Sequence, residues 1–423
     1  MIVKRVGIIG LGKVGTAVIQ SLRKYGSLIS RRTSLKIEVK GVYDVSKDKK
    51  KIASKLALPF TSSTRALIND PDIDIIVELI GGIEPARKFI MEALKKGKNV
   101  VTANKALLAK YGDQIFSLAK KKNLYVGVEA SVCGAIPLIK SISEGLVACQ
   151  VNKIYGILNG TTNYILYKMG KDRLSFSSIL HQAQKKGIAE KDSSLDIEGL
   201  DTVNKLCILS YLCFGIWPNS EKVYTEGISK ISLLDILYAR QMNYRIKLLA
   251  IAKKDKNTLD LRVHPTLVSM EHPLSEVGLA YNAVYFDTQP AGQLLFYGEG
   301  AGGVPTSSSV ISDIVSIGFG AKHFIRGREN ITLSNIKDVK MRYYIRFMAQ
   351  DNPGVLAKIS KILASFSISI ASVTQKERKK GKFVPIVMIT HEAKEADIRK
   401  ALLQIDRLSV INCPSQVIRI EDI

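Results

Sequence analysis

The chain has 423 residues, of which 46% are hydrophobic and 24% charged, so it is long enough for two or three domains rather than one core. Its formal net charge of +24 invites a nucleic-acid interpretation, but the basic residues lie in short clusters along the whole chain, without interleaved aromatic residues. We therefore expect a solvated basic surface and no specific nucleic-acid partner.

The start of the chain and the cysteines indicate a cytoplasmic protein. The sequence runs from Met1 directly into an apolar stretch, Val6–Ile9, without the features of a secretory signal. No apolar run approaches the ~20 residues of a membrane span. The five cysteines are scattered, without the close pairs of zinc or redox sites. We expect free thiols, no membrane association and a cytoplasmic location.

A glycine-rich turn is the first functional motif along the chain. Residues 5–10 (RVGIIG) predict a buried parallel strand, and residues 16–24 predict a helix. Between them, the first glycine permits a tight turn, the second lets the backbone approach a pyrophosphate, and the third lets helix and strand pack closely. The motif predicts a dinucleotide site made by Gly10, Leu11, Gly12, Lys13, Val14 and Gly15.

The residue after the second predicted strand, Asp44, is a candidate ligand of the cofactor. The strand Ile37–Tyr43 ends at Asp44, where a carboxylate would accept hydrogen bonds from the ribose hydroxyls of NAD. The long spacing from the first strand is filled by Tyr25–Leu35, which we interpret as a polar, basic excursion. Lysines at positions 47 and 49–51 would instead suit the 2′-phosphate of NADP. The sequence predicts NAD or NADP and leaves the preference open.

Alternating strands and helices continue to about residue 130. Further strands are expected at 73–79, 99–102 and 125–128, separated by helices such as 86–96 and 113–121. This rhythm predicts an α/β Rossmann fold with a doubly wound parallel sheet over residues 1–130. Gly81–Gly82 then falls at a strand's carboxyl end, where the ligands of such folds lie.

The pattern changes twice after residue 130. Helices at 195–213 and 231–253 and a strand at 153–158 predict an α+β domain over residues 131–297. Residues 340–423 predict strands at 341–349, 368–375 and 383–390, helices at 355–366 and 395–403, and a final strand. This βαββαβ order is ferredoxin-like.

Five separated motifs follow in order along the chain: TANKALLA (102–109), EASVCGAIP (129–137), NGTTNYIL (159–166), AEKDSSLDIEGLDTVNK (189–205) and GEGAGGVPTSSSV (298–310). They resemble the homoserine dehydrogenases, and the resemblance covers essentially the whole chain. At the C-terminal end, residues 349–360 and 372–390 resemble an ACT domain. The resemblance implies reversible reduction of L-aspartate 4-semialdehyde to L-homoserine by NADH or NADPH, in threonine and methionine biosynthesis. It also implies a monofunctional enzyme, because no kinase domain precedes the glycine turn.

The resemblance implies four charged site residues. Lys205 would be the proton donor, and Asp201, four residues earlier on the same helical face, would orient it and contact the substrate. Lys105 matches a second active-site lysine near the nicotinamide and the substrate. Glu190 matches the ligand of the substrate ammonium. The competing interpretation of each is an ordinary solvated surface charge.

The resemblance also implies a structural, sodium-like monovalent cation. Its ligands would be the Glu129 carboxylate and the backbone carbonyls of Val132, Gly134 and Ile136. Cys133 and Ala135 stand where the family often has glycine, so this loop is stiffer here.

Two glycines, Gly187 and Gly302, match backbone positions near the cofactor. We expect residues 298–330 to complete the Rossmann domain late in the sequence. Ser193 and Glu299 stand where the family commonly has proline. None of the five histidines lies in a hydrolase triad or a zinc motif, which disfavours those enzyme classes.

The ACT resemblance implies regulation. Gly354 would let a ligand approach a helix N-terminus, and threonine is the expected effector by analogy. The alternative is a dimerisation module that has lost its ligand. We expect a homodimer or homotetramer. The candidate effector residues are Asn352, Gly354, Val355 and Leu356.

Three other functions stay open at this stage. A dehydrogenase of another amino-acid semialdehyde would differ in substrate competition. A silent nicotinamide or amino-acid sensor would need no proton donor, so retention of Lys105 and Lys205 argues against it. A polyanion-binding protein would lose affinity steeply with salt and show no turnover.

Overall fold

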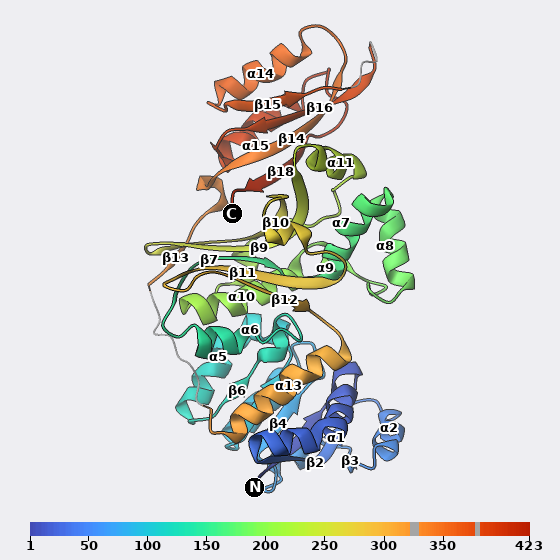
Figure 1. The fold of residues 1–423 in the computed structure, drawn as a ribbon, viewed down its shortest axis with the longest axis vertical. Coiled ribbons are helices and arrows are strands. Elements are labelled where there is room, and N and C mark those ends of the chain that lie inside the picture. The colour runs from blue at the N-terminus through green and yellow to red at the C-terminus, as the bar shows by residue number, and fades with distance from the viewer. Residues whose placement is uncertain (322–329, 377–380) are drawn as a thin grey trace. The chain divides into compact units, whose positions relative to one another are not determined.

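The computed structural model describes residues 1–321, 330–376 and 381–423 (Figure 1). The expected completion of the Rossmann domain over 298–330 and the motif 372–390 therefore fall partly outside the described residues. The chain forms two compact units, each built from three segments. Unit 1 comprises Met1–Ile154, Asp201–Val223 and Tyr281–Asn330, and unit 2 comprises Tyr155–Leu200, Tyr224–Ala280 and Ile331–Ile423.

Unit 1 contains a parallel six-stranded sheet in the order β3-β2-β1-β4-β5-β6, as expected of a Rossmann fold. Its central strand residues are buried because helices cover both faces. The strands are β1 (Ile2–Ile9), β2 (Leu35–Tyr43), β3 (Phe60–Thr61), β4 (Ile75–Glu78), β5 (Asn99–Thr102) and β6 (Val126–Gly127). The helices between them are α1 (Lys13–Thr33), α2 (Lys49–Lys55), α3 (Thr64–Asn69), α4 (Ala86–Lys95) and α5 (Lys105–Lys121).

The first helix is longer than predicted. The helix was predicted over residues 16–24, with a polar, basic excursion over 25–35; that helix end was wrong, because α1 continues to Thr33 and is followed by Ser34 in the left-handed conformation. Ile29 lies one heptad after Leu22 and packs against the same core. Gly26 has open space around it, and a single helical glycine costs only about 1 kcal/mol. Tertiary packing therefore extends the helix past a weak position.

A late segment of the chain returns to this sheet. Helix α13 (Gly303–Gly318) packs on α1, and the Ser21 and Ser307 hydroxyls lie 2.9 Å apart. Apolar residues of α13 share the core of β1 and α1. Unit 1 also contains α6 (Leu138–Lys140), most of α10 (Leu200–Phe214) and the hairpin of β11 (Tyr281–Gln289) and β12 (Gly292–Glu299). Short turns of 3₁₀ or π helix lie at Glu129–Ser131, Ser141–Gly145 and Ser220–Lys222.

Unit 2 contains a long antiparallel pair, β9 (Tyr244–Asp255) and β10 (Thr258–Ser269), joined over twelve residue pairs. The predicted helix over 231–253 was wrong beyond α11 (Leu233–Gln241). Asn243 adopts a left-handed conformation after the helix, and the following apolar run is buried as a strand. Likewise, the predicted helix over 195–213 is split into α9 (Ser194–Ile197) and α10 at Gly199, whose φ is +85°.

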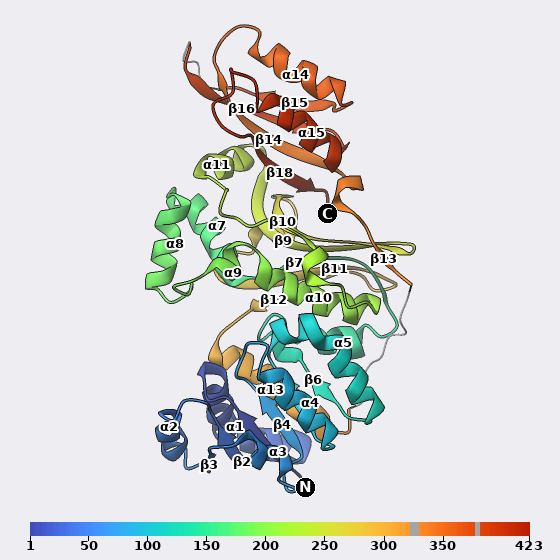
Figure 2. The ribbon, with the colours of Figure 1, turned by 180° about the vertical axis from the view of Figure 1, so that it is seen from behind.

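The C-terminal part of unit 2 has the predicted βαββαβ order. It consists of β14 (Lys340–Gln350), α14 (Val355–Ser365), β15 (Ile370–Thr374), β16 (Phe383–Thr390), α15 (Glu395–Ile405) and β18 (Gln416–Glu421). Strand β18 pairs with β14 on one side and with β10 on the other, so the sheet order β9-β10-β18-β14-β16-β15 is continuous (Figure 2). The remaining elements are β7 (Gln150–Ile157), α7 (Gly160–Asp172), α8 (Phe176–Lys185), β8 (Tyr224–Thr225), α12 (Pro273–Glu276), β13 (Thr332–Leu333), a 3₁₀ turn at Ile336–Asp338 and β17 (Ala393–Lys394).

Candidate active site

Three of the predicted site residues meet in unit 1. The Asp201 carboxylate lies between two ammonium groups: its Oδ2 accepts from Lys205 Nζ at 2.7 Å, and its Oδ1 is 2.7 Å from Lys105 Nζ. The side chains of Asp201 and Lys205 are 6% and 9% exposed, whereas that of Lys105 is 43% exposed. The three groups carry a net charge of +1, with one ammonium buried and the other reachable from solvent.

The two lysines are placed by helix starts and helix spacing. Lys105 is the first residue of α5, whose N-cap Asn104 accepts from the Leu107 amide and donates to the Gly82 carbonyl. Lys205 and Asp201 share one face of α10 because they are four residues apart. The sequence alone gave their shared face, but the approach of α5 to α10 is a tertiary contact.

The electrostatics keep Asp201 ionised. Burial acts to raise the pKa of this carboxyl, but the Lys205 and Lys105 ammonium groups hold it well below its usual value. A permanently charged Asp201 can therefore fix both ammonium groups in place.

The glycine turn has open space in which a nucleotide phosphate could lie. A Cβ on Gly10 would lie 2.7 Å from the Leu79 backbone, and one on Gly15 would lie 2.0 Å from the Gly10 carbonyl oxygen. A Cβ on Gly12 would meet nothing within 4 Å. The first turn of α1 carries no acidic residue. Gly10 and Gly15 are thus required by packing, whereas Gly12 leaves backbone open to a ligand.

Asp44 has a role that the sequence pattern did not reveal. Its Oδ2 accepts from the Leu11 amide at 2.7 Å, and its Oδ1 accepts from the Ser46 amide at 2.9 Å. The carboxylate at the end of β2 therefore holds the glycine turn itself. Its oxygens keep further lone pairs that can accept from ribose hydroxyls.

Glu78 was missed by the sequence analysis because it reads as part of an apolar strand. It is fully buried at the end of β4, accepts from the Thr102 hydroxyl at 2.7 Å and accepts from the Ile80 amide at 2.8 Å. Burial raises the pKa of its carboxyl. Glu78 joins the carboxyl ends of β4 and β5, beside Gly81 and Asn104, the residue that precedes Lys105.

The predicted cation loop is ordered by hydrogen bonds. Both carboxylate oxygens of Glu129 accept from backbone amides, those of Ile139 and Lys140, at 2.8 Å. The Gly134 carbonyl accepts from the Ser309 hydroxyl at 2.6 Å. Val132 and Ile136 are buried. Across residues 1–321, 330–376 and 381–423, no cluster of three or more His, Cys, Asp or Glu side chains could hold a metal ion.

The remaining predicted cofactor and substrate residues are divided between the units. Gly302, with φ +128°, is the N-cap of α13, and the Cβ position of its neighbour Gly303 lies 3.0 Å from the Lys13 carbonyl oxygen, so this segment touches the start of α1. Gly187 and Glu190 belong to unit 2. Gly187 has φ +69° and open space, and Glu190 is exposed.

The predicted effector residues lie together at the start of α14. Gly354 is the N-cap with φ +86°, and nothing lies within 4 Å of its Cβ position. Asn352 and Leu356 are exposed, whereas Val355 is buried. The four residues thus leave the helix N-terminus accessible.

Two general expectations can be compared with the structure. All five cysteines are free of disulfides. Within the described ranges, none of the helices combines the length and apolar character that a membrane crossing needs.

Comparison with known families covers nearly the whole chain. Residues 10–129 match the NAD-binding domain of homoserine dehydrogenase, residues 137–315 match homoserine dehydrogenase, and residues 343–409 match the ACT domain. The homoserine dehydrogenase of Synechocystis sp. is 40% identical over 98% of this chain and 99% of its own, and that of Helicobacter pylori is 40% identical over 99% of both.

Solved structures agree with these matches. A homoserine dehydrogenase from Thiobacillus denitrificans has a TM-score of 0.92 and 41% identity, covering 99% of this chain and 98% of its own. The Staphylococcus aureus enzyme at pH 7.5 has a TM-score of 0.80 and 28% identity over both full chains. The alternatives of a silent sensor or another semialdehyde dehydrogenase gain no support. The chain belongs to the homoserine dehydrogenases, the NAD(P)-dependent oxidoreductases that interconvert L-homoserine and L-aspartate 4-semialdehyde, and it carries a C-terminal ACT domain.

Proposed function

We propose that Lys205 is the proton donor of this reaction and that Asp201 and Lys105 complete the catalytic centre. The observation that carries the proposal is the single buried carboxylate between two ammonium groups, both at 2.7 Å. In the reducing direction, a Lys205 N–H proton passes to the aldehyde oxygen as its carbon accepts the hydride. In the reverse direction, the amine accepts the hydroxyl proton. Lys105 stabilises the oxygen's developing negative charge, and Asp201 fixes both ammonium groups.

Glu190 is the proposed ligand of the substrate ammonium. Its exposed carboxylate is free to accept from a cation, and the residue lies in the segment 189–205 that carries Asp201 and Lys205. The net charge of +1 on the lysine pair and Asp201 would in turn suit a substrate that carries a carboxylate.

The nicotinamide cofactor is assigned to the turn Gly10–Gly15 and to Lys105, Gly187 and Gly302. When bound, it supplies or accepts the hydride. The open position at Gly12 supports a pyrophosphate there, and Asp44 supports ribose hydroxyls as partners. A hyperthermophilic archaeal homoserine dehydrogenase, 26% identical to this chain, is described in complex with NADPH. Both NAD and NADP remain candidates, because lysines follow Asp44 closely.

This cofactor site has a matched pair of tests. Gly12→Ala should raise the KM for the nicotinamide cofactor about tenfold, because its methyl group would occupy the space assigned to the pyrophosphate. Gly26→Ala, within the helix that Gly12 caps and also with open space around it, should leave that KM unchanged. Equal KM values for both variants would refute the assignment.

A sodium-like cation is proposed at Glu129, Val132, Gly134 and Ile136, as a structural group. The prearranged Gly134 carbonyl supports it, and the oxygen lone pairs of Glu129 that the amides leave unused can still bind a hard cation. The midpoint temperature of thermal unfolding should be higher in sodium chloride than in choline chloride at equal ionic strength. Identical midpoints would count against the site.

The remaining proposals concern organisation and regulation. We propose domains at 1–130, completed by about 298–330, at 131–297 and at 340–423. We also propose a homodimer or homotetramer and a cytoplasmic location.

Threonine is the proposed effector, bound near Asn352, Gly354, Val355 and Leu356, where the helix N-terminus is accessible. Loss of inhibition by threonine in Gly354→Val, with uninhibited activity intact, would support this assignment.

The decisive assay follows oxidation of NADH and of NADPH with L-aspartate 4-semialdehyde. Lys205→Met should lower kcat by about 10³-fold, within the range of general acid catalysis. Lys110→Met, an exposed lysine of α5, is the control and should keep full activity. Comparable turnover in Lys205→Met and the wild type would overturn the assignment of the proton donor.

A further inference from the structure

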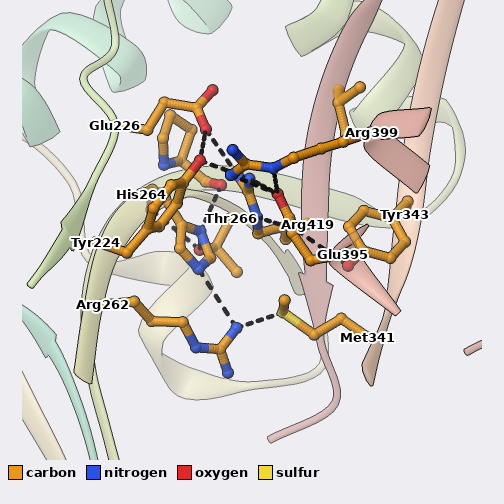
Figure 3. Close-up of polar contacts among 12 residues, drawn as sticks. Tyr224, Glu226, Arg262, His264, Thr266, Met341, Tyr343, Glu395, Arg399 and Arg419 are labelled. Atoms are coloured by element: carbon orange, nitrogen blue, oxygen red, sulfur yellow. Dashed lines mark hydrogen bonds and ion pairs between the residues drawn. The ribbon is translucent and has the colours of Figure 1, made fainter. Parts of the chain in front are cut away.

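A buried arginine in the last strand joins two parts of unit 2 (Figure 3). Arg419 of β18 is 4% exposed, and its Nε donates to Glu395 Oε2 at 2.9 Å. Its Nη1 donates to Glu226 Oε2 at 2.7 Å, and its Nη2 donates to the Tyr224 hydroxyl at 2.7 Å. Glu395 begins α15 of the ACT domain, whereas Tyr224 and Glu226 lie at β8. One guanidinium therefore spans the ACT domain and the segment after α10.

The segment after Glu226 packs tightly against α9. The Ile228 amide donates to the Ile197 carbonyl at 2.9 Å. A Cβ on Gly227 would lie 2.4 Å from that same carbonyl oxygen, so only glycine fits at this approach. A Cβ on Gly199 would lie 3.2 Å from the Thr225 methyl carbon. If the backbone of residues 225–228 moves, the backbone of residues 197–199 must therefore move with it.

Residues 190–199 form the segment that carries the proposed substrate ligand. Its start is held by Gln184, whose Nε2 donates to the Glu190 and Lys191 carbonyls at 3.4 and 3.1 Å. Near its end, Asn159 Nδ2 donates to Asp196 Oδ1 at 2.7 Å. The 225–228 segment is a third support. Asp201 lies two residues after the end of the 190–199 segment.

We propose that Arg419 is a positioning residue for the substrate-binding segment 190–199, acting through Glu226. The ion pair fixes Glu226, the backbone after Glu226 fixes Ile197 and Gly199, and these fix the segment that presents Glu190. The inference rests on the proposed role of Glu190. It places a determinant of substrate affinity in the terminal strand of the ACT domain, although that strand contributes no group to the reaction.

The test compares conservative variants in the full-length enzyme, because removing Arg419 outright could prevent folding. Glu226→Gln and Arg419→Lys should each raise the KM for L-homoserine about fivefold to tenfold, with kcat changed less than about twofold and the cofactor KM unchanged. Because both act on one path, the double variant should show no more than the larger single effect. Arg342→Met is the control: Arg342 lies on the adjacent strand β14, contacts the exposed Asp422 at 3.3 Å, and its replacement should leave KM unchanged.

The outcomes separate the two proposals. If Glu226→Gln and Arg419→Lys lower the unfolding temperature but leave the KM for L-homoserine unchanged, the cluster is structural and the inference is wrong. Glu190→Gln is measured in parallel. If it raises this KM while Glu226→Gln does not, only the positioning inference fails. If Glu190→Gln has no effect, the assignment of Glu190 fails, and the inference fails with it.

Discussion

Two clusters of charged side chains, each built around buried groups, differ in their charge balance. In unit 1, Asp201 faces two ammonium groups, and the group keeps a net positive charge with one lysine half-exposed. In unit 2, Arg419 and Arg399 face Glu395 and Glu226, so two positive charges meet two negative charges. The donors of Arg419 are distributed among Glu395, Glu226 and Tyr224.

This difference in charge balance distinguishes a cluster suited to catalysis from one suited to holding the fold together. An uncompensated charge in a partly open site is costly for folding and useful only when a ligand completes it. A cluster whose charges balance has no such requirement and instead fixes the elements that supply its members. We therefore expect changes in the first cluster to affect turnover, and changes in the second to affect stability and substrate affinity.

The largest effect on stability is expected for Arg419→Met. Removing the arginine leaves Glu395 without its buried partner, and breaking a buried ion pair typically costs about 3–5 kcal/mol. Urea denaturation of the variant should show this loss, while kcat at saturating substrate stays near that of the wild type. If the variant were as stable as the wild type, the Arg419 cluster would not stabilise the fold, and the contrast drawn between the two clusters would be wrong.

Asp201→Asn should affect turnover instead. An amide presents one acceptor oxygen and an NH₂ group, so it cannot fix two ammonium groups, and kcat should fall about 100-fold. Asp192→Asn, an exposed carboxylate of the same motif, is the control. Steady-state kinetics of the two variants, with circular dichroism to verify folding, make the measurement. A kcat within twofold of the wild type in Asp201→Asn would contradict the proposed centre.

A third buried charge, Lys247, sharpens the contrast because its partners are neutral. It donates to Asn163 Oδ1 and to the Val277 carbonyl. Burial, assisted by Arg245, lowers the pKa of this ammonium from 10.5 to about 7. Between these values the unfolded chain binds the extra proton, so folding stability should rise with pH, by at most about 1.4 kcal/mol per unit.

Lys247→Met should remove this pH dependence. The difference in unfolding free energy between wild type and variant, measured by urea denaturation at pH 7, 8 and 9, should shift in favour of the wild type as pH rises. If the unfolding free energies of wild type and variant changed in parallel with pH, Lys247 would stay protonated in the folded protein, and the prediction would be wrong.

The smallest effect is expected for Arg399→Met. Arg399 contacts Glu395 at 2.9 Å, but its side chain is 44% exposed, so solvent screens the pair. Exposed ion pairs contribute about 0–1 kcal/mol. Denaturation should place this variant within about 1 kcal/mol of the wild type. A loss as large as that of Arg419→Met would mean that total charge, rather than burial, decides the stability of the cluster.

Sequence reasoning succeeded where a local pattern carries the information. Strand β16 was predicted at its observed limits, Phe383–Thr390, and the βαββαβ order and the parallel N-terminal sheet followed from periodicity. It failed at β9, because a run of buried apolar residues has no period that distinguishes helix from strand. It also failed at α1, where the contact of Ile29 with the core continues a helix through Gly26.

The sequence by itself determined the family, the glycine turn and the spacing that puts Asp201 and Lys205 on one helical face, because these depend on residues close together in the chain. Only the tertiary structure decided that Lys105 joins them, that Asp44 holds the Leu11 amide, and that Arg419 reaches Glu226. These contacts join residues 33 to 193 positions apart. Such pairings arise from how sheets and helices pack, which no local spacing records.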